Sequence, residues 1–221
     1  DHGPEDVDFR GTITKVEQNF GRSLHRDQLT EAQPFLAYSL NGDPLTKHQG
    51  APLRLIVPGW YGVANVKWLS QIHCQDSDFL GRFQARWYRT LKGEMIDGQM
   101  AWTESAITKM RLKSFIARVT RDGAAYRVLG VVLNDGTPLK SVEVRVDSGP
   151  WQPAVMDAGT RAKHSWKLFT YTWTGATPGD HTLVSRVTDV NGNVQPTAEE
   201  LAVKKTFLED NAQSPRTLTL R

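Results

Sequence analysis

Two long cations, Arg54 and Lys67, flank a short loop that contains a glycine. The chain enters this loop through Pro58-Gly59, a pair that forces a turn, and crosses it as Trp60-Tyr61-Gly62-Val63-Ala64-Asn65. A loop of this kind can present backbone N–H groups to an anion, and the two cations would pair with a phosphate. The alternative is a turn with two solvated cations, because charged side chains usually lie on the surface.

A second stretch, GRFQARWYRT, combines positive charge with aromatic rings. It contains three arginines and three aromatic residues: Arg82, Arg86, Arg89, Phe83, Trp87 and Tyr88. Arginine charge together with a tyrosine hydroxyl suits a small oxyanion. The alternative is aromatic core packing, with the arginines extending outward to solvent.

His73 and Cys74 are adjacent at the end of a segment, Lys67–Cys74, that alternates like a strand. Neighbouring residues on a strand point to opposite faces, so these two side chains do not predict a shared metal site. We expect Cys74 to be a small buried hydrophobic residue. If the segment is extended, Cys74 lies roughly 23 Å beyond Lys67.

The composition of the 221 residues excludes several classes of protein. The formal net charge is only +3 and the basic residues are dispersed, which does not indicate a nucleic-acid-binding protein. No run approaches the roughly 18 apolar residues of a membrane-spanning helix. The single cysteine allows neither an intrachain disulfide nor a cysteine metal cluster. The length suits one large domain or two small ones.

Short apolar runs and turn signals predict the elements of the first half. We expect a short strand around Val7 to Ile13, a helical turn with Ser23 as its N-cap, and a strand from Phe35 to Leu40 closed by Asn41-Gly42. The run from Leu53 to Val57 is predicted as a buried strand. Residues Glu94 to Met110 are polar and are predicted to form a linker or an arm over the surface.

The second half alternates between short strands and turns. The predicted strands are Phe115–Val119, Tyr126–Leu133, Val142–Val146, Trp166–Trp173, Thr182–Val187 and Thr217–Leu220. In SVEVRVD the valines face inward and the charged residues outward. About seven such strands in about 110 residues predict an antiparallel sandwich of immunoglobulin-like type.

HQGAPLRLIVPGWYGVANVKWL resembles the second half of the molybdenum-cofactor domain of the sulfite oxidase family. The arginine, the Pro-Gly pair and the Lys-Trp-Leu triplet stand at that family's separations. LAYSLNGDPL and GRFQARWYRT extend the resemblance, and VEVRVDSGPWQPA, WKLFTYTW and HTLVSRVTDVNGNVQP resemble its dimerisation domain. The implied fold is mostly β with some α: half of an α+β cofactor domain (residues 1–109), then an immunoglobulin-like sandwich (residues 110–221).

The resemblance also implies site residues. Arg54 and Lys67 would hold the pterin phosphate, with help from the loop backbone at Gly62, Val63, Ala64 and Asn65. The family places a histidine directly before the glycine of this motif, whereas this chain has Gln49 there and His48 one position earlier, so both are candidates. Tyr88, 21 residues after Lys67, corresponds to the substrate-pocket tyrosine, with Arg86 beside it. In the family, a basic residue of the second domain extends toward the substrate pocket, and Lys205 and Arg216 are the candidates for it here.

The implied protein is a molybdenum oxidoreductase with a molybdopterin cofactor, transferring an oxygen atom to sulfite or a similar small oxyanion. The expected partners are a second copy of the chain and a cytochrome or other electron acceptor, in the periplasm. The family's molybdenum-ligating cysteine lies upstream, in a half-domain that this chain does not contain, so we expect the chain alone to be inactive. The alternative function is a non-enzymatic, β-rich assembly or binding subunit that dimerises through its sandwich, and metal uptake would separate the two.

Overall fold

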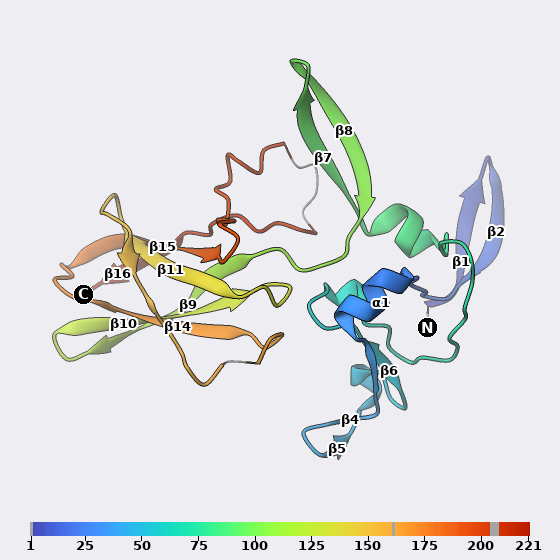
Figure 1. The fold of residues 1–221 in the computed structure, drawn as a ribbon, viewed down its shortest axis with the longest axis horizontal. Helices are drawn as coiled ribbons and strands as arrows, with labels where there is room; N and C mark the ends of the chain where they lie inside the picture. Colours follow the sequence, from blue (N-terminus) through green and yellow to red (C-terminus); the bar gives the residue numbers. More distant parts are fainter. Residues whose placement is uncertain (1, 161, 204–207) are drawn as a thin grey trace.

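The computed structural model describes residues 2–160, 162–203 and 208–221. A β-sandwich forms the C-terminal half, and short paired strands, turns and one seven-residue helix form the N-terminal half (Figure 1). The predicted fold class, mostly β with some α, is confirmed. No helix in these described ranges is long and apolar enough to cross a membrane.

The sandwich consists of two four-stranded antiparallel sheets. One sheet has the order β13 (Val155–Met156), β14 (Lys167–Trp173), β10 (Ala125–Leu133) and β9 (Lys113–Asp122). The other has the order β12 (Gln152–Pro153), β11 (Leu139–Val146), β15 (Gly179–Asp189) and β16 (Arg216–Leu220). The six longer strands were predicted. The short β12 and β13 were missed, because two-residue strands beside prolines leave no alternating pattern to detect.

The sandwich core is built from alternating residues of facing strands. Val142 and Val144 of β11 are buried and pack in one cluster with Val128 and Phe169. The Phe169 ring lies over Gly130, where an added Cβ would stand 2.0 Å from the ring. Glycine at this point therefore gives the ring its space, and the alternation predicted for β11 is confirmed.

The N-terminal half begins with the hairpin of β1 (His2–Phe9) and β2 (Thr12–Gln18). Next, β3 (Phe35–Ala37) pairs with β6 (Arg54–Ile56), and β4 (Ser39–Leu40) pairs with β5 (Asp43–Pro44). The strand predicted for residues 35–40 is thus divided between two pairs. Asn41-Gly42 forms the predicted turn, with φ of 54° and 92°.

The helix α1 (Arg26–Ala32) begins after His25, not after Ser23 as predicted. The His25 N–H donates to Gln28 Oε1 at 2.9 Å, which satisfies a free donor at the helix start. The Ser23 hydroxyl instead accepts from Gln84 Nε2 at 2.6 Å. Ser23 therefore connects the segment before α1 to Gln84, which lies 61 positions later in the chain. The local sequence does not indicate this contact.

Residues Glu94 to Met110 were predicted as a linker or arm, and the linker alternative is wrong. They contribute to a long hairpin of β7 (Arg89–Ile96) and β8 (Gln99–Ala106), which projects from the junction of the two halves (Figure 1). Asp97-Gly98 makes the turn, with φ of 51° and 78°. An Asp-Gly pair is a strong hairpin signal, and it was the clue in the sequence.

The predicted strand from Lys67 to Cys74 is also wrong. Trp68 has φ of 51°, in the left-handed region, and its N–H donates to Gly50 O at 3.3 Å. Leu69 N–H donates to Leu53 O at 2.8 Å, so this segment is held against the residues before β6. The chain then continues without regular structure. Cys74 is exposed on this segment and is not the buried residue that we expected.

The loop after β6 contacts the segment between β8 and β9, which leads into the sandwich. Trp60 pairs with Lys109 in an isolated bridge, and Met110 N–H donates to Gly59 O at 2.9 Å. Trp60 is buried in a small core with Val57 and Ala64. Packing of the Trp60 ring therefore holds the loop that carries the candidate anion site.

Candidate functional site

A single turn receives both cations of the predicted phosphate site. It is the short 3-10 helix η1 (Lys47–Gln49). Arg54 Nη1 donates to Gln49 O at 2.9 Å, and Lys67 Nζ donates to His48 O at 2.7 Å. The structure thus brings Arg54 and Lys67, 13 positions apart, to neighbouring carbonyls.

The turn is held by its own residues. The Gln49 N–H donates to Thr46 Oγ1 at 3.3 Å, and the Thr46 N–H donates to Gln49 Oε1 at 2.8 Å, which is a capping box. Gly50 closes the turn with φ of 105°. The Gln49 side chain therefore has a structural task, while the exposed His48 contributes its main-chain carbonyl.

Arg54 also reaches the loop on its other side. Its Nη2 lies 3.5 Å from Asn65 O, and Asn65 Oδ1 accepts from the Val57 N–H at 2.6 Å. Arg54 Nε is buried and has no hydrogen-bond partner among the residues that the structure describes. A buried guanidinium donor without an acceptor is costly, so this residue is suited to an anionic group that would supply one.

The loop backbone offers fewer donors than predicted. The loop forms the 3-10 turn η2 (Gly62–Ala64), in which Ala64 N–H donates to Tyr61 O and Asn65 N–H to Gly62 O, each at 3.0 Å. Among the residues that the structure describes, none accepts from the N–H of Gly62 or Val63. Of the predicted loop positions, these two keep N–H groups for an anion, and the space around Gly62 is open.

Tyr88 follows a π-helix, η3 (Phe83–Trp87), a form of helix frequently found at functional sites. Its N–H donates to Phe83 O at 2.9 Å, and its half-buried ring stacks on Phe83, with centroids 6.2 Å apart. Phe20 meets the same ring edge-on at 6.3 Å. Arg86, on the preceding turn, is exposed.

Arg22, which was not singled out from the sequence, is linked to Tyr88 through the main chain of Ile107. Its Nη2 donates to Ile107 O at 2.5 Å, and the Ile107 N–H donates to Tyr88 O at 3.0 Å. The guanidinium lies 5.8 Å from the Trp60 ring centroid, while Nε and Nη1 are buried without partners in the described part of the chain. Burial, with a contribution from Arg89, lowers the pKa of Arg22, and Asp78 opposes this shift. The position of Arg22 beside Trp60 and Ile107 results from the fold, because the residues next to Arg22 in the sequence do not indicate it.

The structure therefore presents two groups of site residues. Arg54 and Lys67 lie with η1, and Tyr88 lies with Phe83 and Phe20. No hydrogen bond or ring contact within the described ranges joins Tyr88 or Arg86 to Arg54 or Lys67. The loop contacts Arg54 through Asn65, and it contacts Arg22 through Trp60.

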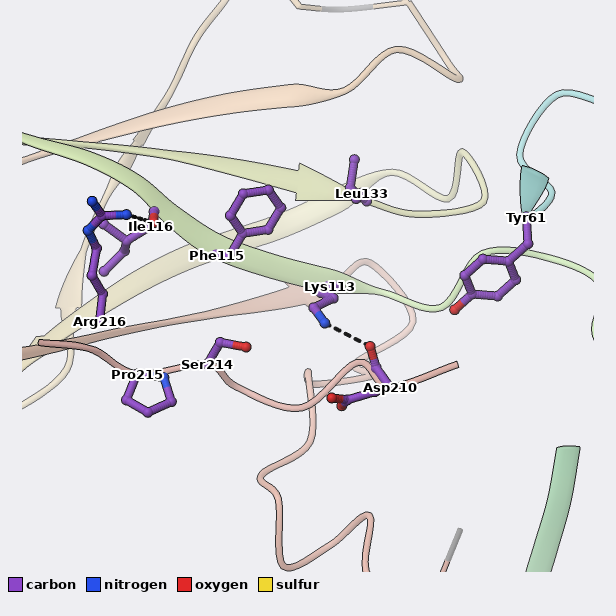
Figure 2. Close-up of a pocket in the computed structure, with 9 residues that line it drawn as sticks. All are labelled: Tyr61, Lys113, Phe115, Ile116, Leu133, Asp210, Ser214, Pro215 and Arg216. Carbon is purple, nitrogen blue, oxygen red and sulfur yellow. Dashed lines mark hydrogen bonds between the residues drawn. The ribbon is translucent and has the colours of Figure 1, made fainter. Parts of the chain in front are cut away.

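A separate groove of about 620 Å³ lies at the edge of the sandwich (Figure 2). Its lining comprises Tyr61, Lys113, Phe115, Ile116, Leu133, Asp210, Ser214, Pro215 and Arg216, so none of the predicted cofactor or catalytic residues lines it. Arg216 Nη1 donates to Ala117 O at 3.1 Å and Ile116 O at 3.3 Å. Arg216 thus covers the outer edge of β9, and Lys205, the other basic candidate, lies outside the described residues.

No group of three or more His, Cys, Asp or Glu side chains in the described part of the chain is placed to hold a metal ion. Arg54 and Lys67 are instead placed to hold an anion.

Comparison with known proteins identifies the family. Residues 1–83 match the model of the oxidoreductase molybdopterin binding domain. Mitochondrial sulfite oxidase of Homo sapiens is 30% identical over 190 residues, which cover 78% of this chain and 34% of the human protein. The crystal structure of the sulfane dehydrogenase SoxCD from Paracoccus pantotrophus matches with a TM-score of 0.73 and 26% identity, over 90% of this chain and 51% of that one. The chain belongs to the sulfite oxidase family.

Sulfite oxidase of Arabidopsis thaliana, 25% identical over 220 residues, covers 88% of the chain. The chain spans about a third of the human enzyme (34%) and about half of the plant enzyme (54%). Nothing among these relatives favours the non-enzymatic assembly subunit. The cofactor that the family implies is the molybdenum cofactor. Arg54 Nε, unpartnered among the described residues, and the Lys67 ammonium, which bonds to the same turn as Arg54, fit the phosphate of its pterin.

Proposed function

We propose that this chain forms part of a molybdenum enzyme that transfers an oxygen atom to sulfite or a similar small oxyanion. In this proposal residues 1–109 are the second half of the cofactor domain, and residues 110–221 are the dimerisation domain. Arg54 and Lys67 hold the pterin phosphate, and Tyr88, with Arg86, faces the substrate.

The observation that carries the proposal is the convergence of Arg54 and Lys67 on the carbonyls of Gln49 and His48. Each cation uses only some of its donors there, since a guanidinium has five N–H groups and an ammonium has three. The remaining donors suit a phosphate, which presents several acceptor oxygens. The free N–H groups of Gly62 and Val63 add two neutral donors on the loop that Arg54 contacts.

When bound, the cofactor supplies the two-electron redox chemistry, and the protein supplies positioning and electrostatics. Arg54 and Lys67 neutralise the phosphate and set the position of the pterin. The Tyr88 hydroxyl donates a hydrogen bond to an oxygen of the oxyanion, and the Phe83 and Phe20 rings hold the tyrosine ring in place. Arg86 adds positive charge near the same substrate.

We further propose that the enzyme works as an assembly, with a homodimer formed through the sandwich and a cytochrome or another protein as electron acceptor. Support comes from the match to SoxCD over 90% of this chain. The sandwich also exposes large apolar side chains, including Val155 at 71% and Trp166 at 61%. Such residues are typical of surfaces that contact another protein when they gather into a patch.

The test uses full-length protein from a host that makes the cofactor. Arg54→Met and Lys67→Met should each lower the pterin bound per chain about tenfold, because a charge-assisted phosphate contact is lost. Arg26→Met, at an exposed position of α1, is the matched control and should change nothing. Folded variants with unchanged pterin fluorescence would refute the cofactor assignment.

The substrate side is tested by Tyr88→Phe. This change keeps the ring packing but removes the hydroxyl, so kcat/KM for sulfite should fall about tenfold or more while pterin content stays constant. An unchanged kcat/KM would remove Tyr88 from the site.

A further inference from the structure

Trp68 has a backbone conformation that large residues rarely adopt. Its φ is 51°, in the left-handed region, which disfavours residues with a bulky side chain. The side chain remains 42% exposed, so burial alone does not account for the conformation. Strain of this kind persists only where surrounding contacts impose it, and it is concentrated at functional sites.

The contacts that impose it come from the turn that receives the two cations. The Trp68 N–H donates to Gly50 O at 3.3 Å, and its indole Nε1 donates to Lys47 O at 2.9 Å. Three successive carbonyls, of Lys47, His48 and Gln49, thus accept from Trp68, Lys67 and Arg54 respectively.

Lys67 is held between Trp68 and this turn. An added Cβ on Gly50 would lie 2.9 Å from Lys67 Cβ and 3.0 Å from Cγ, so the lysine stem runs directly over the glycine. The Lys67 ammonium lies 5.6 Å from the Trp68 ring centroid, within cation–π distance. Lysine is an exposed, flexible cation with many rotamers, and these contacts select one direction for it.

We propose that Trp68 is a positioning residue, which holds the Lys67 ammonium beside Arg54 so that the two cations together bind a phosphate monoester. This inference rests on the proposed function, in which that phosphate belongs to the pterin. Trp68 acts through Lys67 and does not itself contact the phosphate. The indole N–H fixes the ring to the turn, and the ring limits where the ammonium can move.

The first experiment uses Trp68→Phe in the full-length protein. Phenylalanine keeps a ring but loses the donor to Lys47 O, so bound pterin should fall about fivefold. Trp102→Phe, at an exposed tryptophan of the β7–β8 hairpin, is the matched control and should leave pterin unchanged. Unchanged pterin in folded Trp68→Phe would overturn the inference.

A double-mutant comparison separates positioning from a general structural role. If Trp68 acts through Lys67, Trp68→Phe should lower pterin no further in a Lys67→Met background. A further loss there would contradict the inference. If Lys67→Met itself leaves pterin unchanged, the proposed function fails at Lys67. If Lys67→Met lowers pterin and Trp68→Phe does not, only the role of Trp68 fails.

A third measurement requires no variant that must fold. Inorganic phosphate is titrated into cofactor-free wild-type protein while the indole N–H resonances are followed by NMR. Capture of phosphate by Lys67 and Arg54 should shift the Trp68 signal, while the signal of Trp102 stays constant. A Trp68 signal that stays still at saturating phosphate would overturn the inference.

Discussion

Gly59 lies directly against the main-chain carbonyl of Asp135, since a Cβ on residue 59 would stand 2.4 Å from that oxygen. Asp135 belongs to the turn between β10 and β11 of the sandwich, whereas Gly59 begins the loop between Arg54 and Lys67. The anion-site loop and the sandwich therefore meet at a point where no side chain fits. The φ of Gly59, 77°, adds a second reason for glycine.

We predict that Gly59→Ala lowers the free energy of unfolding by about 2 kcal/mol or more, through backbone strain and overlap with Asp135. Denaturant unfolding measures the change. Gly62→Ala, in the same loop but with open space around it, is the control and should alter stability by less than about 0.5 kcal/mol. Equal effects of the two changes would contradict the close packing of Gly59.

Gln195 should be the most sensitive amide of the sandwich. It is fully buried; its Oε1 accepts from the Ser114 N–H at 2.9 Å, and its Nε2 donates to Ser114 O and Ala212 O, each at 3.1 Å. Gln195→Leu leaves these groups without partners and should destabilise the protein by about 3 kcal/mol. Gln71→Leu, at an exposed position, is the comparison, and a similar loss there would argue against the network.

The His181–Asp147 pair should make stability depend on pH. His181 Nδ1 lies 2.8 Å from Asp147 Oδ2, and Nε2 lies 2.8 Å from Thr177 O. The bond to Asp147, then that to Thr177, raises the pKa of His181 above its ordinary 6.5. The bond from His181 lowers the pKa of Asp147 below 3.8.

The histidine's contribution is therefore complete below pH 6.5 and is lost as the pH rises through its raised pKa. The carboxylate's contribution is complete above pH 3.8 and is lost as the pH falls through its lowered pKa. The melting temperature of the wild type should exceed that of His181→Gln by the largest amount between pH 3.8 and pH 6.5. This difference should shrink at alkaline pH. A difference independent of pH would refute this, and His73→Gln, on the exposed segment, is the control.

We expect the protein to be a dimer at micromolar concentration. The reason is the sandwich, which resembles the family's dimerisation domain and exposes Val155, Trp166 and Val190. Light scattering over a dilution series gives the mass directly. At roughly 10 μM and above, a specific interface should hold two chains together. A clean monomer in this range would count against the assembly.

Cys74→Ser should change neither cofactor content nor stability, because Cys74 is exposed on a segment without regular structure. We also predict that the 221-residue chain alone does not oxidise sulfite, since molybdenum in this family takes a protein thiolate and Cys74 is the single cysteine. Metal analysis and a sulfite assay check both statements. Activity that disappears in Cys74→Ser would place the metal site at Cys74.

Local patterns predicted the sandwich and the turns well. Alternation in β11 and the Asn41-Gly42 pair depend on residues adjacent in the chain, and both appear as expected. Asp97-Gly98 carried an equally local signal for the β7–β8 hairpin, which the polar composition around it obscured. Such features are readable because side-chain period and backbone φ are set within a few residues.

The sequence by itself determined which residues form the candidate anion site, since Arg54 and Lys67 stand at fixed positions around a recognisable loop. Only the tertiary structure decided that both cations dock on the carbonyls of η1, that Trp68 turns into the left-handed region and that Cys74 is exposed. It also placed Arg22 beside Trp60 and Ile107. The reason is that these outcomes depend on which distant backbone groups come within hydrogen-bond reach, and that is settled by closure of the whole chain and not by neighbours in sequence.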